Sequence, residues 1–364
     1  MLSPIKIRQL REIATASSAA STAQWAAALQ ERGTPAVDDA AWWVLSAERA
    51  ANNGERVAAL RAWHQAACLG AQGWDQEVLD ALGLGTAAAW QQRAASMTQE
   101  KASLLRESYA EIRRAAGVRA LFRIDRALAG YLGEASVFSS HPMQRPKVMY
   151  VPGLQSGGFI DPASHPLVSP LAANWQTLRE DFLSALSGGD GIEPFLGTAD
   201  ATVSSEYVSG REGASWDALF FFRHGRRYTE NHARFPRSSA LLDSLDLCVI
   251  DGQAPEVCFS ILQPGSRIEP HHGVTNARVV IHIPLKVPQG CFLELTDVGR
   301  HHWREGEAFV FDDTFEHSAE NPTQEVRGIL LMDAWHPELT MPERMAFRAI
   351  IEALTLLEAP PDSP

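Results

Sequence analysis

The second half of the chain contains a series of short apolar runs that decides the fold. They read EVCFSIL (256–262), ARVVIHIPL (277–285), CFLEL (291–295), AFVF (308–311) and VRGILLMD (326–333), and turn-forming triplets such as PGS, PQG, DVG and EGE lie between them. Short runs rich in β-branched and aromatic residues, separated by Gly, Pro and Asp, are typical of the strands of a sandwich or barrel. We therefore predict a jelly roll here rather than a doubly wound parallel sheet.

Alternation within two of these runs puts polar side chains on one face of each strand. Arg278 and His282 share one face of the run at 277–285, and the Val and Ile residues between them share the other. In the last run Arg327 lies on the same face as Asp333. A buried guanidinium needs an anion to satisfy its donors, so this pattern predicts a site for a carboxylate ligand. An ion pair within the chain, of Arg327 with Asp333 or Glu325, is the alternative.

Two histidines beside these runs are candidate metal ligands. His271 and His317 each follow a turn and lie 46 positions apart (317 minus 271), and Arg327 follows the second by ten residues. Such a set can hold a metal ion and a carboxylate together. Strand alternation does not distinguish neighbours in a turn, so His272 is an alternative to His271.

The first part of the chain has a different texture. Residues 5–133 are rich in alanine and predict helices, and the segment 38–70 predicts a helix, an NNG turn and a second helix with Ala and Trp at helical spacing. The pair resembles one tetratricopeptide-type repeat, although such stacks need three. We expect a helical cap on a catalytic core, with recruitment of a protein partner as the alternative.

Prolines at 142 and 146 predict a linker after these helices. The predicted fold class is therefore α+β, with a helical domain at 1–140, a jelly-roll domain at 147–345, and a helix and tail at 346–364. Between linker and jelly roll we expect an amphipathic helix at 170–186, then a long loop at 187–213 that acts as a lid.

Composition excludes several classes of protein. Acidic residues outnumber basic ones 44 to 32, which gives a net charge of -12 and disfavours a nucleic-acid surface. Four cysteines without paired spacing predict neither a zinc knuckle nor a disulfide framework, and they fit a reducing cytoplasm. The sequence has no apolar run long enough for a signal peptide or a membrane span, so we expect a soluble cytoplasmic protein.

Several segments, in order, resemble the aspartyl/asparaginyl β-hydroxylase family of iron(II)- and 2-oxoglutarate-dependent oxygenases. They are PGSRIEPHHGVTNARVVIHIPL (264–285), FDDTFEHSAEN (311–321), the arginine at 327 and DAWHPEL (333–339), and the similarity includes PLAANWQTLRED (170–181) and ENHARFP (230–236). The similarity runs from about residue 147 to 344 and implies a double-stranded β-helix, which is a jelly-roll or cupin-like fold.

The resemblance also implies roles for particular residues. His271 and His317 would bind iron(II), and Gly273 stands where other such oxygenases have a carboxylate ligand. Arg327, with Ser260, would bind the distal carboxylate of 2-oxoglutarate. The resemblance implies that His282 hydrogen-bonds this cosubstrate and that Arg278 contacts cosubstrate or substrate, with a structural ion pair as the alternative for Arg278.

Two aspartates precede His317 and could supply the missing carboxylate. We expect Asp312 and Asp313 instead to cap the turn through backbone N–H groups, as aspartates commonly do.

The implied activity is hydroxylation of an unactivated carbon, such as the β-carbon of an Asp or Asn residue in a peptide or protein, or of a free amino acid or natural-product intermediate. Some family members carry a second arginine where this chain has Val280, which puts an acidic substrate in doubt. The alternatives are a non-haem iron halogenase, with halide in the space at Gly273, and a jelly-roll binding protein without enzymatic activity.

Overall fold

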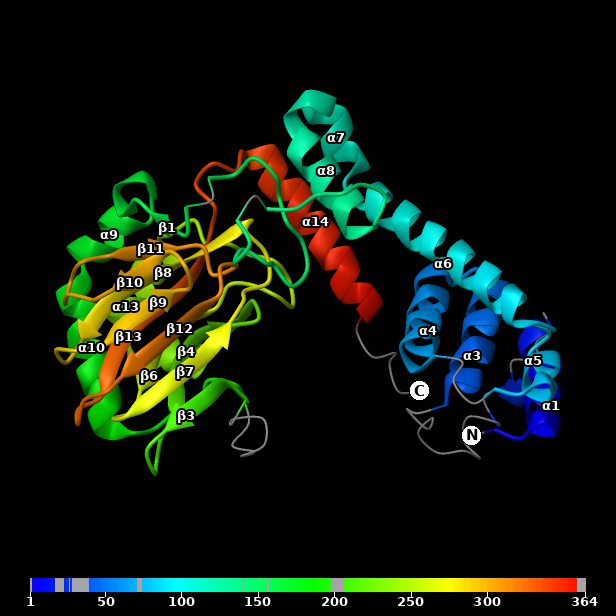
Figure 1. Cartoon of the computed structure of the whole chain (residues 1–364), viewed down its shortest axis with the longest axis horizontal. Coiled ribbons are helices and arrows are strands. Elements are labelled where there is room, and N and C mark those ends of the chain that lie inside the picture. Colours follow the sequence, from blue (N-terminus) through cyan, green and yellow to red (C-terminus); the bar gives the residue numbers. More distant parts are fainter. Residues whose placement is uncertain are drawn as a thin grey trace. The chain divides into compact units, whose positions relative to one another are not determined.

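The computed structural model describes residues 2–16, 23–25, 27, 39–70, 74–139, 141–155, 157–197 and 206–358. The chain divides into one unit of Met1–Glu111 with Ala349–Pro364 and another of Ile112–Arg348, and each is described by itself. Helices form the first unit and antiparallel sheets dominate the second, so the fold is α+β, as predicted (Figure 1). The domain limits at 1–140, 147–345 and 346–364 stay predictions.

The first unit contains the helices α1 (Pro4–Thr15), α3 (Ala40–Asn52), α4 (Arg56–Leu69), α5 (Gln76–Ala81) and α6 (Ala87–Ser108). Short polar side chains cap the starts of α1, α3, α5 and α6. Asp39 accepts the backbone N–H of Trp42, and Thr86 accepts that of Ala89, which satisfies donors that a helix leaves open at its first turn.

The helix pair predicted within 38–70 is confirmed as α3 and α4. Trp42 is almost fully buried between them, and the small side chains of Ala47 and Ala66 allow the two helices to approach closely. The tetratricopeptide-like character of this region stays a prediction.

The second unit contains two antiparallel sheets that form a double-stranded β-helix, so the predicted jelly roll is confirmed (Figure 1). The larger sheet has the strand order β1-β11-β8-β13-β6-β4-β2, with β5 paired to β4, and the smaller has the order β10-β9-β12-β7-β3. The strands are β1 (Phe159–Ile160), β2 (Glu193–Pro194), β3 (Val208–Gly210), β4 (Trp216–Arg223), β5 (Arg226–Arg227), β6 (Val257–Leu262), β7 (Ser266–His271), β8 (Arg278–Lys286), β9 (Phe292–Leu295), β10 (Gly299–His301), β11 (Phe309–Phe311), β12 (His317–Asn321) and β13 (Arg327–Trp335).

Helices cover the outer face of the larger sheet. Phe182 of α10 packs edge-on against Phe259 of β6, with ring centroids 5.6 Å apart. A Cβ atom at Gly328 would lie 2.0 Å from the Phe182 ring, so the glycine is what lets helix and sheet meet this closely. Burying a phenylalanine of this kind contributes roughly 2–3 kcal/mol. The helices are α9 (Val168–Ala173), α10 (Trp175–Gly188), α12 (Thr229–Arg234) and α13 (Pro236–Asp243).

Two expectations for the segment before the core strands need adjustment. The helix predicted at 170–186 is two helices, α9 and α10, that meet at Asn174. The loop predicted at 187–213 contains the short strands β2 and β3, and residues 198–205 at its centre lie outside the described residues, so its role as a lid stays a prediction.

The remaining helices of the described chain are α7 (Ala110–Ala116), η1 (Val118–Leu121), α8 (Phe122–Tyr131), η2 (Pro162–Ser164) and α14 (Met341–Glu358). None of the helices in the described residues combines the length and apolar content that a bilayer-spanning segment requires.

Candidate functional site

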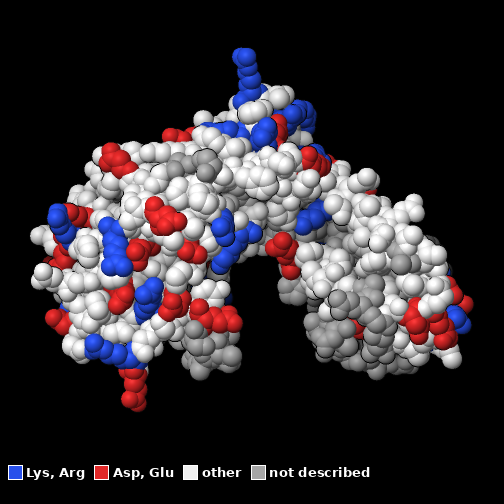
Figure 2. Space-filling model, in the orientation of Figure 1, with Lys and Arg blue, Asp and Glu red and all other residues white. Residues whose placement is uncertain are grey.

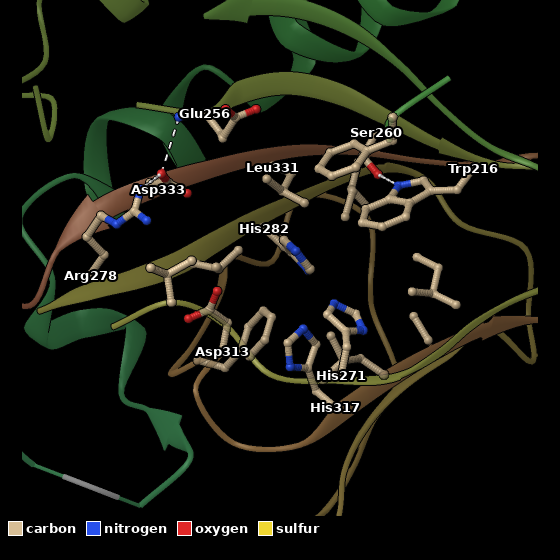
Figure 3. Close-up of a pocket in the computed structure, with 18 of the residues that line it drawn as sticks. Trp216, Glu256, Ser260, His271, Arg278, His282, Asp313, His317, Leu331 and Asp333 are labelled. Carbon is tan, nitrogen blue, oxygen red and sulfur yellow. Dashed lines mark hydrogen bonds and ion pairs between the residues drawn. The ribbon is translucent and has the colours of Figure 1, made fainter. Parts of the chain in front are cut away.

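A cavity of about 440 Å³ lies inside the jelly roll, lined by side chains from the inner faces of both sheets (Figure 3). Arg278, Val280 and His282 of β8 line it, whereas Val279, Ile281 and Ile283 of the same strand belong to the apolar core under the helices. Arg327 and Asp333 of β13 also line the cavity. The strand alternation predicted from the sequence is therefore confirmed.

His271 and His317 meet at one wall of this cavity because their strands pair. They are direct partners in the register of β7 and β12, and their ring centroids lie 4.1 Å apart. The Nδ1 atom of His271 lies 2.8 Å from the carbonyl oxygen of Glu269, and that of His317 lies 2.9 Å from the carbonyl oxygen of Phe315. Each Nδ1 thus carries the proton, and each Nε2 keeps a lone pair for a metal ion.

Burial keeps both rings neutral, as metal ligation requires. It lowers the pKa of His271, and it lowers the pKa of His317 to about 3, with the neighbouring His271 adding to the effect. The other candidate, His272, hydrogen-bonds the carbonyl oxygen of Thr314 through Nδ1 and does not line the cavity. The structure therefore brings His271, and not His272, together with His317.

Asp313 is a functional candidate for which sequence reasoning expected another role. Asp312 does cap the turn, accepting the backbone N–H of Thr314 at 2.9 Å, but the Asp313 side chain points the other way and lines the cavity. A Cβ atom at Gly273 would lie 2.1 Å from Cγ of Asp313. The prediction that both aspartates cap the turn is wrong for Asp313, because successive residues here face opposite sides and only Asp312 reaches the N–H two residues on.

Burial and the neighbouring Asp312 raise the pKa of Asp313 to about 8. The carboxyl group fills the space that a side chain at position 273 would need, beside the two histidines (Figure 3). Among the residues that the structure describes, no three or more His, Cys, Asp and Glu side chains already form a metal-binding group. The geometry offers two neutral imidazoles, a donor type that iron(II) accepts, with the protonated carboxyl group of Asp313 next to them.

Arg327 is buried at another wall, and no carboxylate among the described residues pairs with it. It is 1% exposed, its Nη1 donates to Ser260 Oγ at 3.3 Å, and its Nε has no partner. Burial lowers its pKa to about 10, so the guanidinium is still charged at neutral pH. Of the two carboxylates suggested as partners, Asp333 pairs with Arg278 and Glu325 with Lys286, so within the described residues the ion-pair alternative for Arg327 is wrong.

Two tryptophans orient the polar groups around Arg327, and sequence reasoning did not single them out. Trp216 Nε1 donates to Ser260 Oγ at 2.9 Å, and Trp303 Nε1 donates to Nδ1 of His282 at 3.3 Å. Burial lowers the pKa of His282 well below its usual value, so the ring is neutral and its proton lies on Nε2. That Nε2 is buried without a partner, which leaves a donor beside the guanidinium for an anionic ligand.

Arg278 and its neighbours form the opposite end of the cavity. The Arg278 guanidinium pairs with Asp333 at 2.5 Å, so the ion-pair alternative for Arg278 is the arrangement that the structure shows. Glu256, just before β6, also lines this end, and its carboxylate accepts the backbone N–H of His224 at 2.6 Å (Figure 3). Strand parity could have found Glu256, since it shares the inward face with Ser260.

Comparisons with known proteins relate the chain to one family. Residues 172–337 match the model of the family described as aspartyl/asparaginyl beta-hydroxylase. The chain is 31% identical to the mouse aspartyl/asparaginyl beta-hydroxylase over 185 residues, which is 50% of this chain and 23% of that protein. It is also 31% identical to the mouse aspartate beta-hydroxylase domain-containing protein 2 over 225 residues, or 60% of this chain and 62% of that protein.

The chain thus spans less than two thirds of the length of these curated relatives. Among solved structures, a Pseudomonas putida prolyl-4-hydroxylase aligns with 45% of this chain and 87% of its own, at 14% identity and a TM-score of 0.28. A likeness this distant adds no argument to the sheets already described.

Proposed function

We propose, from the premise that residues 172–337 belong to the aspartyl/asparaginyl β-hydroxylase family, that the protein is an iron(II)- and 2-oxoglutarate-dependent hydroxylase of an unactivated carbon. The observation that carries the proposal is a buried guanidinium, Arg327, with no carboxylate partner in the described residues and with an unpartnered Nε. It lines the same cavity as the neutral pair His271 and His317. An anion would satisfy the guanidinium and a metal ion would use the imidazole lone pairs, and 2-oxoglutarate and iron(II) would supply the two.

His271 and His317 would hold the iron through Nε2, since both Nδ1 atoms are committed to backbone carbonyls. Bound iron would supply the activation of oxygen that the side chains cannot provide. Asp313 would hydrogen-bond groups that occupy the remaining positions around it. The residues present therefore fit a two-histidine site completed by cosubstrate and water.

The distal carboxylate of 2-oxoglutarate would be bound by Arg327 and Ser260. The guanidinium presents a planar fork of donors, and the Ser260 hydroxyl, which already accepts from Trp216 and Arg327, is free to donate its own proton. His282 Nε2–H would donate to the same cosubstrate. Around them Phe311, Leu331 and Ile329 line the cavity with apolar surface that limits access of water.

The overall reaction would consume substrate R–H, oxygen and 2-oxoglutarate and yield R–OH, succinate and carbon dioxide. Each product contains atoms from these reactants alone, so no further reductant is needed. The substrate would be an amino-acid unit, in a peptide or protein or as a free amino acid or natural-product intermediate. Halogenation is not favoured, because the Asp313 carboxyl group fills the space at Gly273 that a halide would need.

Reconstitution tests the proposal. Protein loaded with iron(II) under air should convert 2-oxoglutarate to succinate, and His317→Ala should lose at least nine tenths of that rate. His302→Ala is the matched control, since His302 does not line the cavity. A jelly-roll binding protein would instead give no succinate above the His317→Ala background although metal binds.

Recruitment of a protein partner by the helical unit and a cytoplasmic location stay predictions. On the face of the β-sheet unit in view in Figure 2, basic and acidic groups are interspersed, in keeping with the prediction against nucleic acid.

A further inference from the structure

The cations that line the Arg278 end of the cavity are already committed to acids of this chain. Arg278 pairs with Asp333 at 2.5 Å, and Arg223 pairs with Glu193 at 3.1 Å while it also donates to the carbonyl oxygen of Phe195 at 2.8 Å. Neither guanidinium therefore has the open fork of donors that Arg327 presents. A substrate carboxylate entering here would have to break one of these pairs.

Carboxyl groups outnumber guanidinium groups in the lining at the same end, where Glu256, Asp313 and Asp333 lie with Arg223 and Arg278, and burial raises the pKa of Asp313 to about 8, so that this one is protonated at neutral pH. Glu256 lines the cavity, and the polar groups on it are the backbone N–H of His224 and Nδ1 of the same residue, 3.1 Å away. The His224 side chain is two-thirds exposed, and burial together with Arg223 lowers its pKa, so at neutral pH it is not a cation.

Val280 lies between Arg278 and His282 on the inward face of β8. It is 8% exposed, faces the cavity and offers no charge, whereas some members of the family carry an arginine there. Lys147 stands outside the lining: it is exposed, and it lies 6.0 Å from the ring of Tyr207. The end of the cavity left for substrate thus holds apolar surface, two guanidinium groups that are already ion-paired, and the carboxyl group of Glu256.

Two buried nitrogen atoms at the Arg327 end indicate a ligand site in this cavity, independently of the acids described above. His282 Nε2 and Arg327 Nε both belong to residues more than nine-tenths buried, and both are unpartnered in its lining. Their end takes an anion, which leaves the acidic end for the second reactant.

From this distribution of charge, and resting on the proposed function, we propose that the enzyme takes a substrate with a cationic nitrogen, an amine or guanidine, and that Glu256 is the residue that binds it. Glu256 directly precedes β6 and lines the same cavity as Ser260 of that strand, so cosubstrate and substrate nitrogen would be held from two positions of one short segment. A buried carboxylate that gains a cationic partner recovers solvation that it lost on folding, whereas a substrate carboxylate beside it is repelled.

A matched panel of compounds tests the inference. Lysine, arginine, norleucine, asparagine and aspartate are compared, each as the free amino acid and as the N-acetyl amide, for stimulation of 2-oxoglutarate turnover and for a gain of one oxygen by mass. Lysine or arginine forms should half-saturate at concentrations at least 10-fold below aspartate forms. The acetyl amides distinguish a basic side chain from an α-ammonium group as the source of the cation.

Two variants connect the preference to the residues. The preference is measured as the half-saturating concentration of the norleucine form divided by that of the lysine or arginine form. Glu256→Gln should lower this ratio about 10-fold. Glu294→Gln, which removes a carboxylate paired with Arg300 outside the cavity, should leave the ratio unchanged. Val280→Arg should shift preference toward aspartate forms. Equilibrium dialysis of labelled lysine amide and aspartate amide against each variant gives the same comparison without turnover.

The outcomes separate this inference from the proposed function. Aspartate forms that half-saturate or bind best, no cationic member that stimulates turnover or binds, or a preference untouched by Glu256→Gln would each overturn the inference while succinate production continued. Absence of succinate in the unaltered enzyme would overturn the proposed function, and the dialysis comparison would still decide the role of Glu256.

Discussion

The two ends of the cavity differ in how their charged groups are satisfied. At one end Arg327 and His282 are buried with nitrogen atoms that have no partner, and at the other Arg278 is closed by Asp333. Leaving a buried donor unsatisfied costs about 1–3 kcal/mol, more when it is charged, so a ligand that accepts from these nitrogen atoms would stabilise the open end, which is the Arg327 end. The Arg278 end has no such unsatisfied donor and is free to vary with the substrate.

The contrast explains why the residues proposed to bind cosubstrate and the residues proposed to bind substrate lie at different ends of the cavity. The open end, with the histidine pair, suits a small anion and a metal ion whatever the second reactant is. The Arg278 end holds Val280 and Glu256, whose side chains, on the inference above, would decide which second reactant is accepted. Variants at the two ends should therefore change different kinetic constants.

The largest effect should come from Arg327→Leu. Removing the guanidinium deletes the charged donors for the cosubstrate carboxylate, worth about 3 kcal/mol, so kcat/KM for 2-oxoglutarate should fall by about 100-fold. Succinate formation as a function of 2-oxoglutarate concentration measures it. Arg300→Leu, which removes an arginine paired with Glu294 outside the cavity, is the matched control and should stay within about twofold of the unaltered enzyme. An unchanged KM for 2-oxoglutarate in Arg327→Leu would show that the open end is not the cosubstrate site.

The next largest effect should come from Gly273→Ala, which tests the close contact between Gly273 and the carboxyl group of Asp313. The added Cβ would lie 2.1 Å from Cγ of Asp313, so Asp313 has to move and its carboxyl group leaves the neighbourhood of the histidines. We expect iron(II) affinity to fall by about 10-fold and the protein to lose roughly 1–3 kcal/mol of stability through overpacking. Competition with a chelator and urea denaturation measure the two.

Gly188→Ala is the control for that substitution. Gly188 lies in α10 with nothing nearer than 4.0 Å to the added Cβ, so neither iron affinity nor stability should decrease. Equal iron affinity in both variants would mean that Asp313 has no part in the metal site.

Sequence reasoning predicted the open end well and the Arg278 end poorly, for a physical reason. The inward faces of β8 and β13 follow from alternation, so the residue order alone was enough to place Arg327, His282 and Arg278 on them. The partner of Arg278 could not be assigned in this way, because Asp333 and Glu325 were equally available to Arg327 until the register of the strands was fixed. From the sequence alone, either of the adjacent Asp312 and Asp313 could cap the turn, so both were predicted to do so. Only the geometry of the turn shows that Asp312 reaches the backbone N–H and that Asp313 faces the cavity.

At the Arg278 end, the effect of pH on the free energy of unfolding, through Glu256, should be smaller than the effects of the two substitutions above. Burial raises the pKa of Glu256 from 4.5 to about 7, so the folded state holds this proton more tightly than the unfolded chain does. The contribution of Glu256 to stability is therefore fully present below about pH 4.5 and is lost as the pH rises through about 7. Glu256→Gln cannot ionise, so relative to the unaltered protein it should gain on the order of 1–3 kcal/mol of unfolding free energy between pH 5 and pH 8.

Urea denaturation at the two pH values measures this gain. The carbonyl oxygen of the introduced glutamine can still accept the His224 N–H, so that hydrogen bond is not a difference between the proteins. Glu294→Gln, outside the cavity, gives the baseline for removing one carboxylate. A difference between Glu256→Gln and unaltered protein that is constant from pH 5 to pH 8 would contradict the burial argument.

The smallest effect should come from Trp303→Phe, which alters how the open end is held without touching its charges. The substitution removes the N–H that donates to Nδ1 of His282 at 3.3 Å, and with it the bond that keeps the proton on Nε2. One neutral hydrogen bond contributes about 1 kcal/mol, so KM for 2-oxoglutarate should rise roughly fivefold while kcat changes little. The Nε2 proton resonance of His282 should also shift, a change that altered packing alone would not require. Because the same ring lies 5.1 Å from the Arg327 guanidinium, phenylalanine keeps an aromatic face there and isolates the hydrogen bond as the cause.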